Sequence, residues 1–410
     1  RVCLLGSVLF SALAFGCAED YPQESPGLSL TLSGPIKYLG PVSIREPMVA
    51  EHPDGALFVA GFTQAMEESQ RPPKLHKSVD AGATWTAVDV WTPTRGAVGN
   101  SDVDLAIGPD GTLYFLTMGF DRSKSEGTHI AVGVSQDIGE TWRWTTLSED
   151  RFVDRPWIEV GPDGVVHVIW NDGEGVSYSV SRDAGETWTE RPRINPQGGS
   201  SHLAVGPGGE IAVRITPLSA SGNRYDEGVD LLAVSVDGGT TWEKLTPPGT
   251  RSWSSDPQPR WVEPVAWDAD GTLYHLWSEG SDLWLGRSAD RGNTWDSWII
   301  VTGDVPQYFP YLTARGPGEL AATWFSGFGD DLLAHVALIS DIGGDRPSVR
   351  QADPFQIDSW ILDGDSLFRN PGGEYIPIRF LSDGDLGVVA PIQNPLENRR
   401  GFTWYRVSYE

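Results

Sequence analysis

An eight-residue motif, Ser-x-Asp-x-Gly-x-Thr-Trp, recurs along this chain of 410 residues and restricts the folds open to it. The five nearly complete copies begin at Ser78, Ser135, Ser181, Ser235 and Ser288. A degenerate sixth copy begins at Ser340. A regular period of about 50 residues is typical of repeat architectures, in which one supersecondary unit is copied many times.

A second repeat alternates with the first. It is a turn of the Pro-Asp-Gly type between two short apolar runs, such as the β-branched and aromatic run 165–170. Its seven copies are centred on Asp54, Asp110, Asp163, Gly208, Asp270, Gly318 and Asp383. Each unit is therefore interpreted as strand A, hairpin, strand B, longer loop, strand C, motif and strand D. Such units predict an all-β fold, a seven-bladed β-propeller with four-stranded antiparallel blades.

The last unit is incomplete, because 401–409 forms its strand C and no strand D follows. A strand within 28–42 lies before the first strand A at the distance that other D strands keep. We therefore expect the ring to close by pairing of this N-terminal strand in the C-terminal blade, which also covers two sheet edges. Residues 28–410 are predicted to form a single propeller domain.

The N-terminus is predicted to be an export signal over residues 1–16, because its apolar run is too short to cross a bilayer as a helix. The run ends at Cys17 in a sequence similar to a bacterial lipobox, which predicts lipidation of Cys17 and a tether over 17–27. A plain secretory signal is the alternative. Cys3 and Cys17 are the only cysteines, so a disulfide-based fold is excluded. The predicted location is the bacterial cell envelope as a lipoprotein, or the exterior.

The formal charge of −26 disfavours nucleic acid and anionic membranes as partners, so membrane contact is expected only through the lipid anchor. No His, Asp or Glu spacing suggests a metal site, and no cofactor motif is present. A structural calcium ion in an acidic loop such as 329–331 is an alternative. We expect a monomer whose partner is a glycan or glycoconjugate.

Propellers bind ligands where the D–A and B–C connections meet around the central axis. The residues at these connections predict a site with catalytic candidates Asp102, Glu263 and Tyr308 and ligand-binding candidates Arg45, Asp154, Arg155, Arg260, Trp170 and Trp277. Glu46, Arg122 and Glu374 lie at the same connections. Aromatic rings stack on sugars, carboxylates transfer protons and arginines hold acidic groups, so this set suits a glycan. The alternative is that these charges form structural ion pairs between blades.

The eight-residue motif is similar to the Asp-box of the sialidase-like superfamily, also called the bacterial neuraminidase repeat. The resemblance extends over almost the whole chain after the signal. It implies a propeller with the boxes at the rim, and we expect their tryptophans to be buried between blades. In that family an arginine in Phe-Arg-Ile-Pro holds the substrate carboxylate, and Arg45 in Ile44-Arg45-Glu46-Pro47 matches it. The family's motif around a nucleophilic tyrosine has no match, and its members generally have six blades.

Three functions remain open at this level. The first is an exported, lipid-anchored propeller that binds or processes glycans on its axial face, as a glycoside hydrolase or polysaccharide lyase if it is an enzyme. The second is an exo-sialidase that uses Arg45 and a tyrosine. The third is a non-catalytic propeller that binds glycans or proteins.

Overall fold

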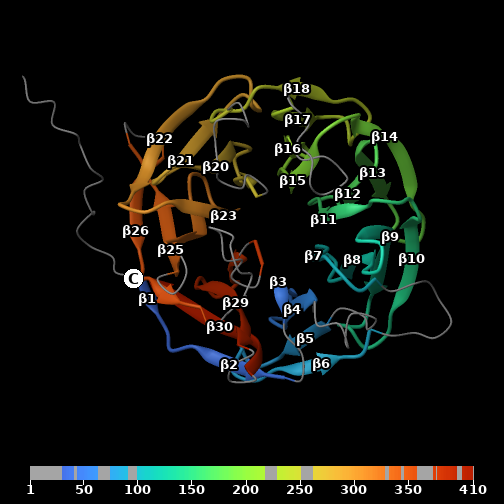
Figure 1. Cartoon of the computed structure of the whole chain (residues 1–410), viewed down its shortest axis with the longest axis horizontal. Helices are drawn as coiled ribbons and strands as arrows, with labels where there is room; N and C mark the ends of the chain where they lie inside the picture. The colour runs from blue at the N-terminus through green and yellow to red at the C-terminus, as the bar shows by residue number, and fades with distance from the viewer. Residues whose placement is uncertain are drawn as a thin grey trace, which may run out of the picture.

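The computed structural model of the chain contains seven antiparallel sheets arranged in a ring (Figure 1). It describes residues 30–40, 44–62, 74–90, 99–217, 229–250, 262–327, 332–342, 346–357, 373–374, 376–394 and 399–409. Within these ranges no helix is long and apolar enough to cross a bilayer. The seven-bladed all-β propeller predicted from the two repeats is confirmed.

The blades follow one another along the chain. Blade 1 consists of β3 (Arg45–Glu51), β4 (Leu57–Phe62), β5 (Lys74–Ser78) and β6 (Thr86–Val88). Blade 2 consists of β7 (Val103–Ile107), β8 (Leu113–Asp121), β9 (Glu126–Ser135) and β10 (Arg143–Ser148). Blade 3 consists of β11 (Asp154–Val160), β12 (Val166–Asp172), β13 (Gly175–Ser181) and β14 (Thr189–Asn195). Blade 4 consists of β15 (Gly199–Val205), β16 (Ile211–Thr216), β17 (Leu231–Ser235) and β18 (Glu243–Leu245).

Three further blades complete the ring. Blade 5 consists of β19 (Val265–Trp267), β20 (Leu273–Glu279), β21 (Asp282–Ser288) and β22 (Asp296–Thr302). Blade 6 consists of β23 (Gln307–Ala314), β24 (Leu320–Ser326), β25 (Leu333–Ser340) and β26 (Ser348–Gln351), with β27 (Phe355–Gln356) also paired to β25. Blade 7 consists of β28 (Ile378–Phe380), β29 (Leu386–Asn394) and β30 (Arg399–Tyr409), and its outer edge is formed by β1 (Leu30–Leu32) and β2 (Ile36–Leu39).

The two ends of the chain close the ring, as predicted. Both β1 and β2 pair antiparallel with β30, in registers that run from Leu30 opposite Tyr409 to Leu39 opposite Gly401 (Figure 1). The closing strand is interrupted at Pro35, which has no backbone N–H for the sheet ladder. Ser33 bridges part of the break, since its N–H and its hydroxyl each donate to the Arg406 carbonyl at 2.8 Å.

The repeated motif forms the turn between strands C and D through bonds within its own eight residues. In the first copy the Asp80 carboxylate accepts the Thr84 N–H at 2.8 Å and the Thr84 hydroxyl at 2.6 Å. The Ser78 hydroxyl accepts the Gly82 N–H at 2.9 Å, and Gly82 has a φ of 90°. These bonds hold the pKa of the Asp80 carboxyl below its usual value, the Thr84 hydroxyl having the largest effect. The turn is therefore determined locally, as the sequence indicates.

The motif tryptophans are buried to different extents. Trp85 and Trp142 are buried, and their indole nitrogens donate to the carbonyls of the motif glycines at 3.0 and 3.1 Å. Trp188, Trp242 and Trp295 are only partly buried. The expectation of equal burial was therefore wrong for three of the five copies.

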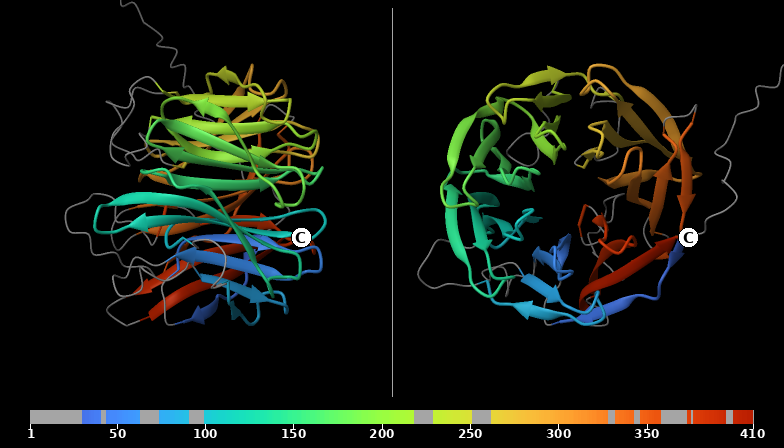
Figure 2. Two further views of the ribbon diagram at one scale, coloured as in Figure 1. Left: turned by 90° about the vertical axis from the view of Figure 1, so that its right-hand side faces the viewer. Right: turned by 180° about the vertical axis from the view of Figure 1, so that it is seen from behind.

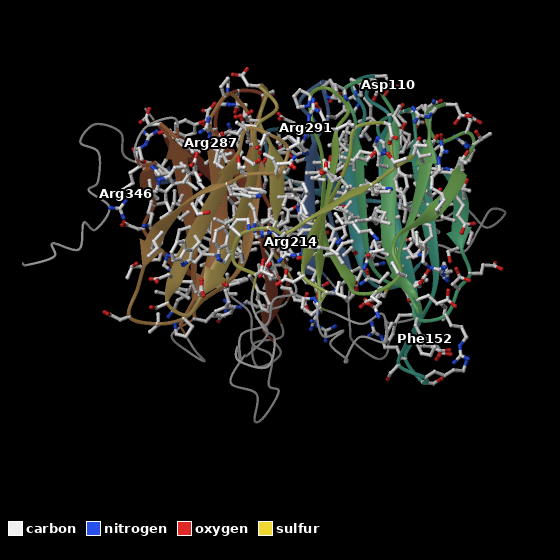
Figure 3. All side chains as sticks on the ribbon, turned by 90° about the horizontal axis from the view of Figure 1, so that it is seen from above. Asp110, Phe152, Arg214, Arg287, Arg291 and Arg346 are labelled. Atoms are coloured by element: carbon white, nitrogen blue, oxygen red, sulfur yellow. The ribbon has the colours of Figure 1, made fainter. Side chains whose placement is uncertain are left out.

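The first strand of each blade lines the central axis, and the last strand lies at the rim (Figures 1 and 2). Between neighbouring sheets the core is apolar; for example Val59 and Trp85 of blade 1 pack with Phe402 and Trp404 of blade 7. Asp110, in a turn between strands A and B, and Arg291, in a turn between strands C and D, lie on one face of the ring (Figure 3). Phe152 lies on the opposite face (Figure 3). Phe152 precedes β11, so that opposite face carries the D–A connections.

Candidate functional site on the central axis

Three inner strands begin with the same local distortion. A residue with positive φ stands directly before a proline at Glu46–Pro47 in β3, Arg155–Pro156 in β11 and Phe309–Pro310 in β23, with φ values of 44°, 48° and 51°. At each place the register between strands A and B shifts, which marks a β-bulge. Positive φ at a non-glycine residue costs about 1–3 kcal/mol and is concentrated at functional sites. The three bulges lie at the entrance to the axis and make it a candidate site.

Seven charged residues gather there, and we call them the axial cluster. They come from blades 1, 2, 3 and 7 and are Arg45, Glu46, Asp102, Arg122, Asp154, Arg155 and Glu374. Arg155 Nη2 donates to Glu374 Oε2 at 2.5 Å, and Arg155 Nε lies 4.0 Å from Asp154 Oδ2. Arg45 Nη2 lies 3.7 Å from Glu46 Oε1. The cluster therefore joins blade 3 to blade 7 across the axis.

A glycine allows the blade 7 connection to approach blade 1. A Cβ atom on Gly373 would lie 2.7 Å from both Cγ and the backbone nitrogen of Glu46, and Gly373 has a φ of 146°. Any side chain at this position would push the connection away. The close approach brings the neighbouring Glu374 to Arg155 and Glu46.

Carboxyl groups outnumber arginines in the axial cluster, and the excess of carboxyl groups changes their own ionisation. Burial, and then the Asp102 charge, raise the pKa of Asp154 to about 7. Burial together with Asp102 and Glu374 raises the pKa of Glu46 well above its usual value. Burial also raises the pKa of Glu374, against the opposing effect of Arg155. At neutral pH the Asp154 carboxyl is therefore partly protonated, as a general acid requires.

Two of the arginines share their surroundings. Burial lowers the pKa of Arg122, and the nearby charge of Arg45 lowers it further, while Asp102 raises it. Arg45 is buried, and its guanidinium carbon lies 5.9 Å from the centroid of the Phe62 ring. The charges of Arg45 and Asp102 therefore both act on Arg122, and two neighbouring guanidinium groups suit an anionic group of a ligand.

Glu263 occupies a different environment from the axial cluster. Its carboxylate accepts a hydrogen bond from Arg214 Nη2, which also donates to Asp230 Oδ1 at 2.5 Å. Arg214 and Glu263 are fully buried, and Glu263 Oε2 lies 3.7 Å from His275 Nε2. The structure therefore places this catalytic candidate in an ion network between blades 4 and 5. Arg214 was not among the predicted site residues, although it stands in the apolar run of β16 (Ile211–Thr216), where an arginine is a recognisable exception.

The aromatic candidates are also buried. Trp277 is covered on both faces, by His275 at 5.0 Å and by Trp284 at 5.9 Å between ring centroids. Trp170 is buried in the core, and the buried hydroxyl of Tyr308 donates to the Gly327 carbonyl at 3.1 Å. Packing is therefore the role that this geometry favours for all three rings. Arg260, Cys17 and the acidic loop 329–331 lie outside the described residues.

Of the nine predicted site residues, the structure brings four together in the axial cluster: Arg45, Asp102, Asp154 and Arg155. A proline one or two residues later, as in Asp154-Arg155-Pro156 and Arg45-Glu46-Pro47, is a sequence signal for Arg45, Asp154 and Arg155, whereas no proline follows Asp102 at this distance. Among the described residues, no group of three or more His, Cys, Asp or Glu side chains is arranged to hold a metal ion.

Comparison with known proteins gives local sequence matches and full-length fold matches. No family model matches the chain. It is 29% identical over 188 residues to a sialidase of Bacteroides fragilis, covering 41% of this chain and 33% of that protein. It is 28% identical over 202 residues to an oligoxyloglucan-reducing end-specific xyloglucanase of Emericella nidulans, covering 48% and 20%. The chain thus spans a third or less of the length of these curated relatives.

Two solved structures match nearly the whole fold. A streptogramin B lyase has a TM-score of 0.53 at 13% identity and covers 93% of this chain and 98% of its own. YCF48 from Cyanidioschyzon merolae has a TM-score of 0.53 at 13% identity and covers 92% and 98%. At this identity the likeness extends to the fold alone. The repeated motif, the ring of seven sheets and the local match to a sialidase together describe a sialidase-like β-propeller.

Proposed function

We propose that the axial cluster binds and processes glycans as a glycoside hydrolase, with Asp154 as the proton donor. The observation that carries the proposal is the pKa of Asp154, which burial and Asp102 raise to about 7. A general acid works best when its pKa lies near the working pH. The Asp154 side chain is 27% exposed, against 11% for Arg155 and Glu374, so it is more open to a ligand than these two neighbours.

Asp102 supplies the second carboxyl group of the proposed mechanism. It precedes β7 on the blade next to Asp154, and its charge acts on both Asp154 and Glu46. Glycoside hydrolases use one carboxylic acid to protonate the leaving oxygen and one carboxylate as base or nucleophile. Arg155 is held by Glu374 and keeps its charge beside Asp154. The arrangement therefore provides an acid, a carboxylate and a fixed cation at one place.

The sequence relatives support the same class of substrate. The matching regions belong to a sialidase and to a xyloglucanase, both of which are named for action on glycans. A test is to assay the full chain against a panel of neutral and acidic aryl glycosides and oligosaccharides, measuring released reducing sugar. Turnover of any member supports the proposal. Glycan binding without turnover of any member would favour the non-catalytic alternative.

An exo-sialidase is the second candidate, and the proximity of the Arg45 and Arg122 guanidinium groups favours it, because two arginines can hold one ligand carboxylate. We expect Arg45→Ala to weaken an acidic-glycan ligand by about ten- to a hundredfold, which corresponds to the loss of a charge-assisted contact of about 1.5–3 kcal/mol. Binding of neutral glycans should not change. Glycan-array titration of the wild type and the variant measures both.

The surface variant Arg287→Ala is the matched control, since Arg287 forms a solvent-exposed pair with Asp296 at 3.6 Å. It should bind like the wild type. Equal losses for acidic and neutral glycans in Arg45→Ala would contradict carboxylate recognition by Arg45, because they would indicate a general disturbance of the entrance.

We also propose export and lipid attachment at Cys17, on the basis of the lipobox-like sequence before it. A Cys17→Ser variant should stay unlipidated in a bacterial host and move from the membrane fraction to the soluble fraction. Mass spectrometry of the N-terminal peptide and fractionation are the measurements. Membrane association that persists in Cys17→Ser would exclude this anchor.

A further inference from the structure

The β-bulge of blade 3 brings two neighbouring residues of the axial cluster together. Asp154 and Arg155 are consecutive in β11, and in a regular strand the side chains of consecutive residues point to opposite faces of the sheet. Yet Arg155 Nε lies 4.0 Å from Asp154 Oδ2. The register between β11 and β12 shifts directly after Asp154. A bulge of this kind re-aims a side chain, and here it turns the Arg155 guanidinium toward the Asp154 carboxyl.

The backbone of the bulge is strained. Arg155 has a φ of 48° and stands directly before Pro156, whereas a residue before proline favours an extended backbone with negative φ. Such a conformation persists only where the surrounding structure holds it. The contacts that hold the Arg155 peptide therefore also determine where its charge lies.

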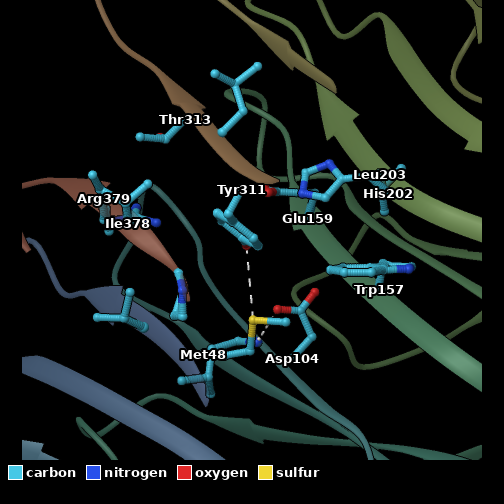
Figure 4. A pocket seen from close by; sticks show the side chains of 14 residues that line it. Met48, Asp104, Trp157, Glu159, His202, Leu203, Tyr311, Thr313, Ile378 and Arg379 are labelled. Carbon is cyan, nitrogen blue, oxygen red and sulfur yellow. Dashed lines mark hydrogen bonds between the residues drawn. The ribbon is translucent and has the colours of Figure 1, made fainter. Parts of the chain in front are cut away.

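The strand is fixed on both sides of the bulge. Before the bulge, Asp154 stands opposite Asn171 in the ladder with β12. After it, Trp157 lines a pocket on the axis together with His202 of β15, and their ring centroids are 5.1 Å apart (Figure 4). His202 follows Ser200 by two residues in the same strand. The first strand of blade 4 therefore lies against β11 at the bulge.

Ser200 and Asn171 hold the peptide between these two points. The Ser200 hydroxyl donates to the Arg155 carbonyl oxygen at 2.9 Å. Asn171 Oδ1 accepts the Ser200 N–H at 2.6 Å and also lies 2.9 Å from Ser200 Oγ. The single hydroxyl hydrogen is shared between the two acceptors. Asn171 therefore fixes Ser200, and Ser200 ties the bulge of blade 3 to blade 4.

Packing alone does not explain an asparagine at this place. Asn171 and Ser200 are both fully buried. The amide nitrogen of Asn171 has no hydrogen-bond partner among the residues that the structure describes. Burying an unpaired amide donor lowers stability, and local costs of this kind are expected where a residue serves a site. The gain that accompanies this cost is the bond from Oδ1 to Ser200.

We propose that Asn171 and Ser200 are positioning residues, which hold the bulge at Arg155 and thereby keep its guanidinium beside the Asp154 carboxyl. Both act through Arg155. Without the hydroxyl of Ser200 the peptide relaxes toward the extended backbone that a residue before proline favours, and the guanidinium moves away from Asp154. The inference rests on the proposed function, in which Asp154 is the proton donor, but its test needs no turnover.

The test is NMR titration of the Asp154 carboxyl in the full chain. Burial and the charges of Asp102 and Glu374 raise the pKa of Asp154, and the Arg155 charge lowers it. Ser200→Ala should therefore move the titration midpoint upward by about 0.5–1 pH unit, because an opposite charge within about 4–6 Å lowers a carboxyl pKa by about 1–3 units. Asn171→Ala removes the acceptor that fixes Ser200 and should move the midpoint in the same direction.

Two comparisons separate positioning from a general loss of packing. Ser179→Ala is the matched control, because Ser179 is a buried serine of the same blade whose hydroxyl donates to the Thr189 carbonyl at 3.3 Å, and it should titrate like the wild type. In an Arg155→Gln background, Ser200→Ala should cause no further change, since the charge through which it acts is gone.

The outcomes distinguish this inference from the proposed function. An unchanged Asp154 titration in Ser200→Ala and Asn171→Ala, with thermal melts showing folded variants, would overturn the positioning role. A change of equal size in Ser179→Ala, or one that persists without the Arg155 charge, would also overturn it. The expected upward movement in a protein that cleaves no glycan would support the positioning of Arg155 and refute the proposed function.

Discussion

Asp154→Asn is expected to lower kcat/KM by about 10²–10⁴-fold for any glycan that the protein cleaves, the range that general acid catalysis contributes. Asparagine has nearly the same shape as aspartic acid but no proton to give. Stability should not fall, because a carboxyl whose pKa is raised to about 7 in the fold is costly to ionise there. Kinetics and thermal melts of one preparation therefore separate a catalytic role from a structural one.

The pH profile provides a second check on Asp154. The protonated form is the active one, so kcat/KM should decline as pH rises through about 7. Asp102→Asn removes the negative neighbour that helps to raise this pKa, and also a carboxyl group of the proposed mechanism. Its effect is therefore measured by NMR titration of the Asp154 carboxyl, which should ionise at lower pH than in the wild type. Asp296→Asn, at an exposed carboxylate, is the control and should keep the wild-type profile. An active Asp154→Asn enzyme with the wild-type profile would exclude Asp154 as the proton donor.

Arg214→Ala is expected to destabilise the protein by about 3–5 kcal/mol, since removing one partner of a buried ion network leaves the others uncompensated. Arg214 is fully buried, and its guanidinium donates to Asp230, Glu263 and the carbonyls of Ile215 and Leu231. Its loss would leave two buried carboxylates facing each other. Denaturation in guanidinium chloride measures the change in the free energy of unfolding.

Two further variants show whether uncompensated buried charge is the cause of the stability loss in Arg214→Ala. Arg287→Ala removes an exposed ion pair and should cost less than about 1 kcal/mol. A triple variant with Arg214→Met, Asp230→Asn and Glu263→Gln should be more stable than Arg214→Met alone, because the stranded charges are gone. If Arg214→Ala costs under about 1 kcal/mol, the network does not hold blades 4 and 5 together.

The blade count and the ring closure were predictable because they rest on local interactions. In the repeated motif, Ser78, Asp80, Gly82 and Thr84 satisfy one another within the turn, so eight residues suffice to specify it. The seven turns of the Pro-Asp-Gly type along the chain then determine the number of sheets. The missing last strand required a partner, and Leu30–Leu32 and Ile36–Leu39 supply it opposite β30.

The candidate site was predictable only in part. The places of Asp102, Asp154 and Glu263 in the sequence, at the start of a strand A, predicted that they share one face of the ring. Their places in the sequence do not show which charged residue lies next to each of them. Glu263 meets Arg214 from the adjacent blade and is neutralised in the core. Asp154 meets Asp102 as well as Arg155, remains partly open and keeps its proton near neutral pH.

The sequence by itself therefore determined the turns, the repeat and the closed ring of blades, because short-range hydrogen bonds and strand patterns specify them. Only the tertiary structure decided which carboxyls are paired, which have a raised pKa and which stay partly exposed. The physical reason is that ionisation and burial depend on charges and packing contributed by other blades. Glu374 lies more than two hundred residues from Arg155 in the chain, and yet its carboxylate oxygen accepts the hydrogen bond that holds Arg155.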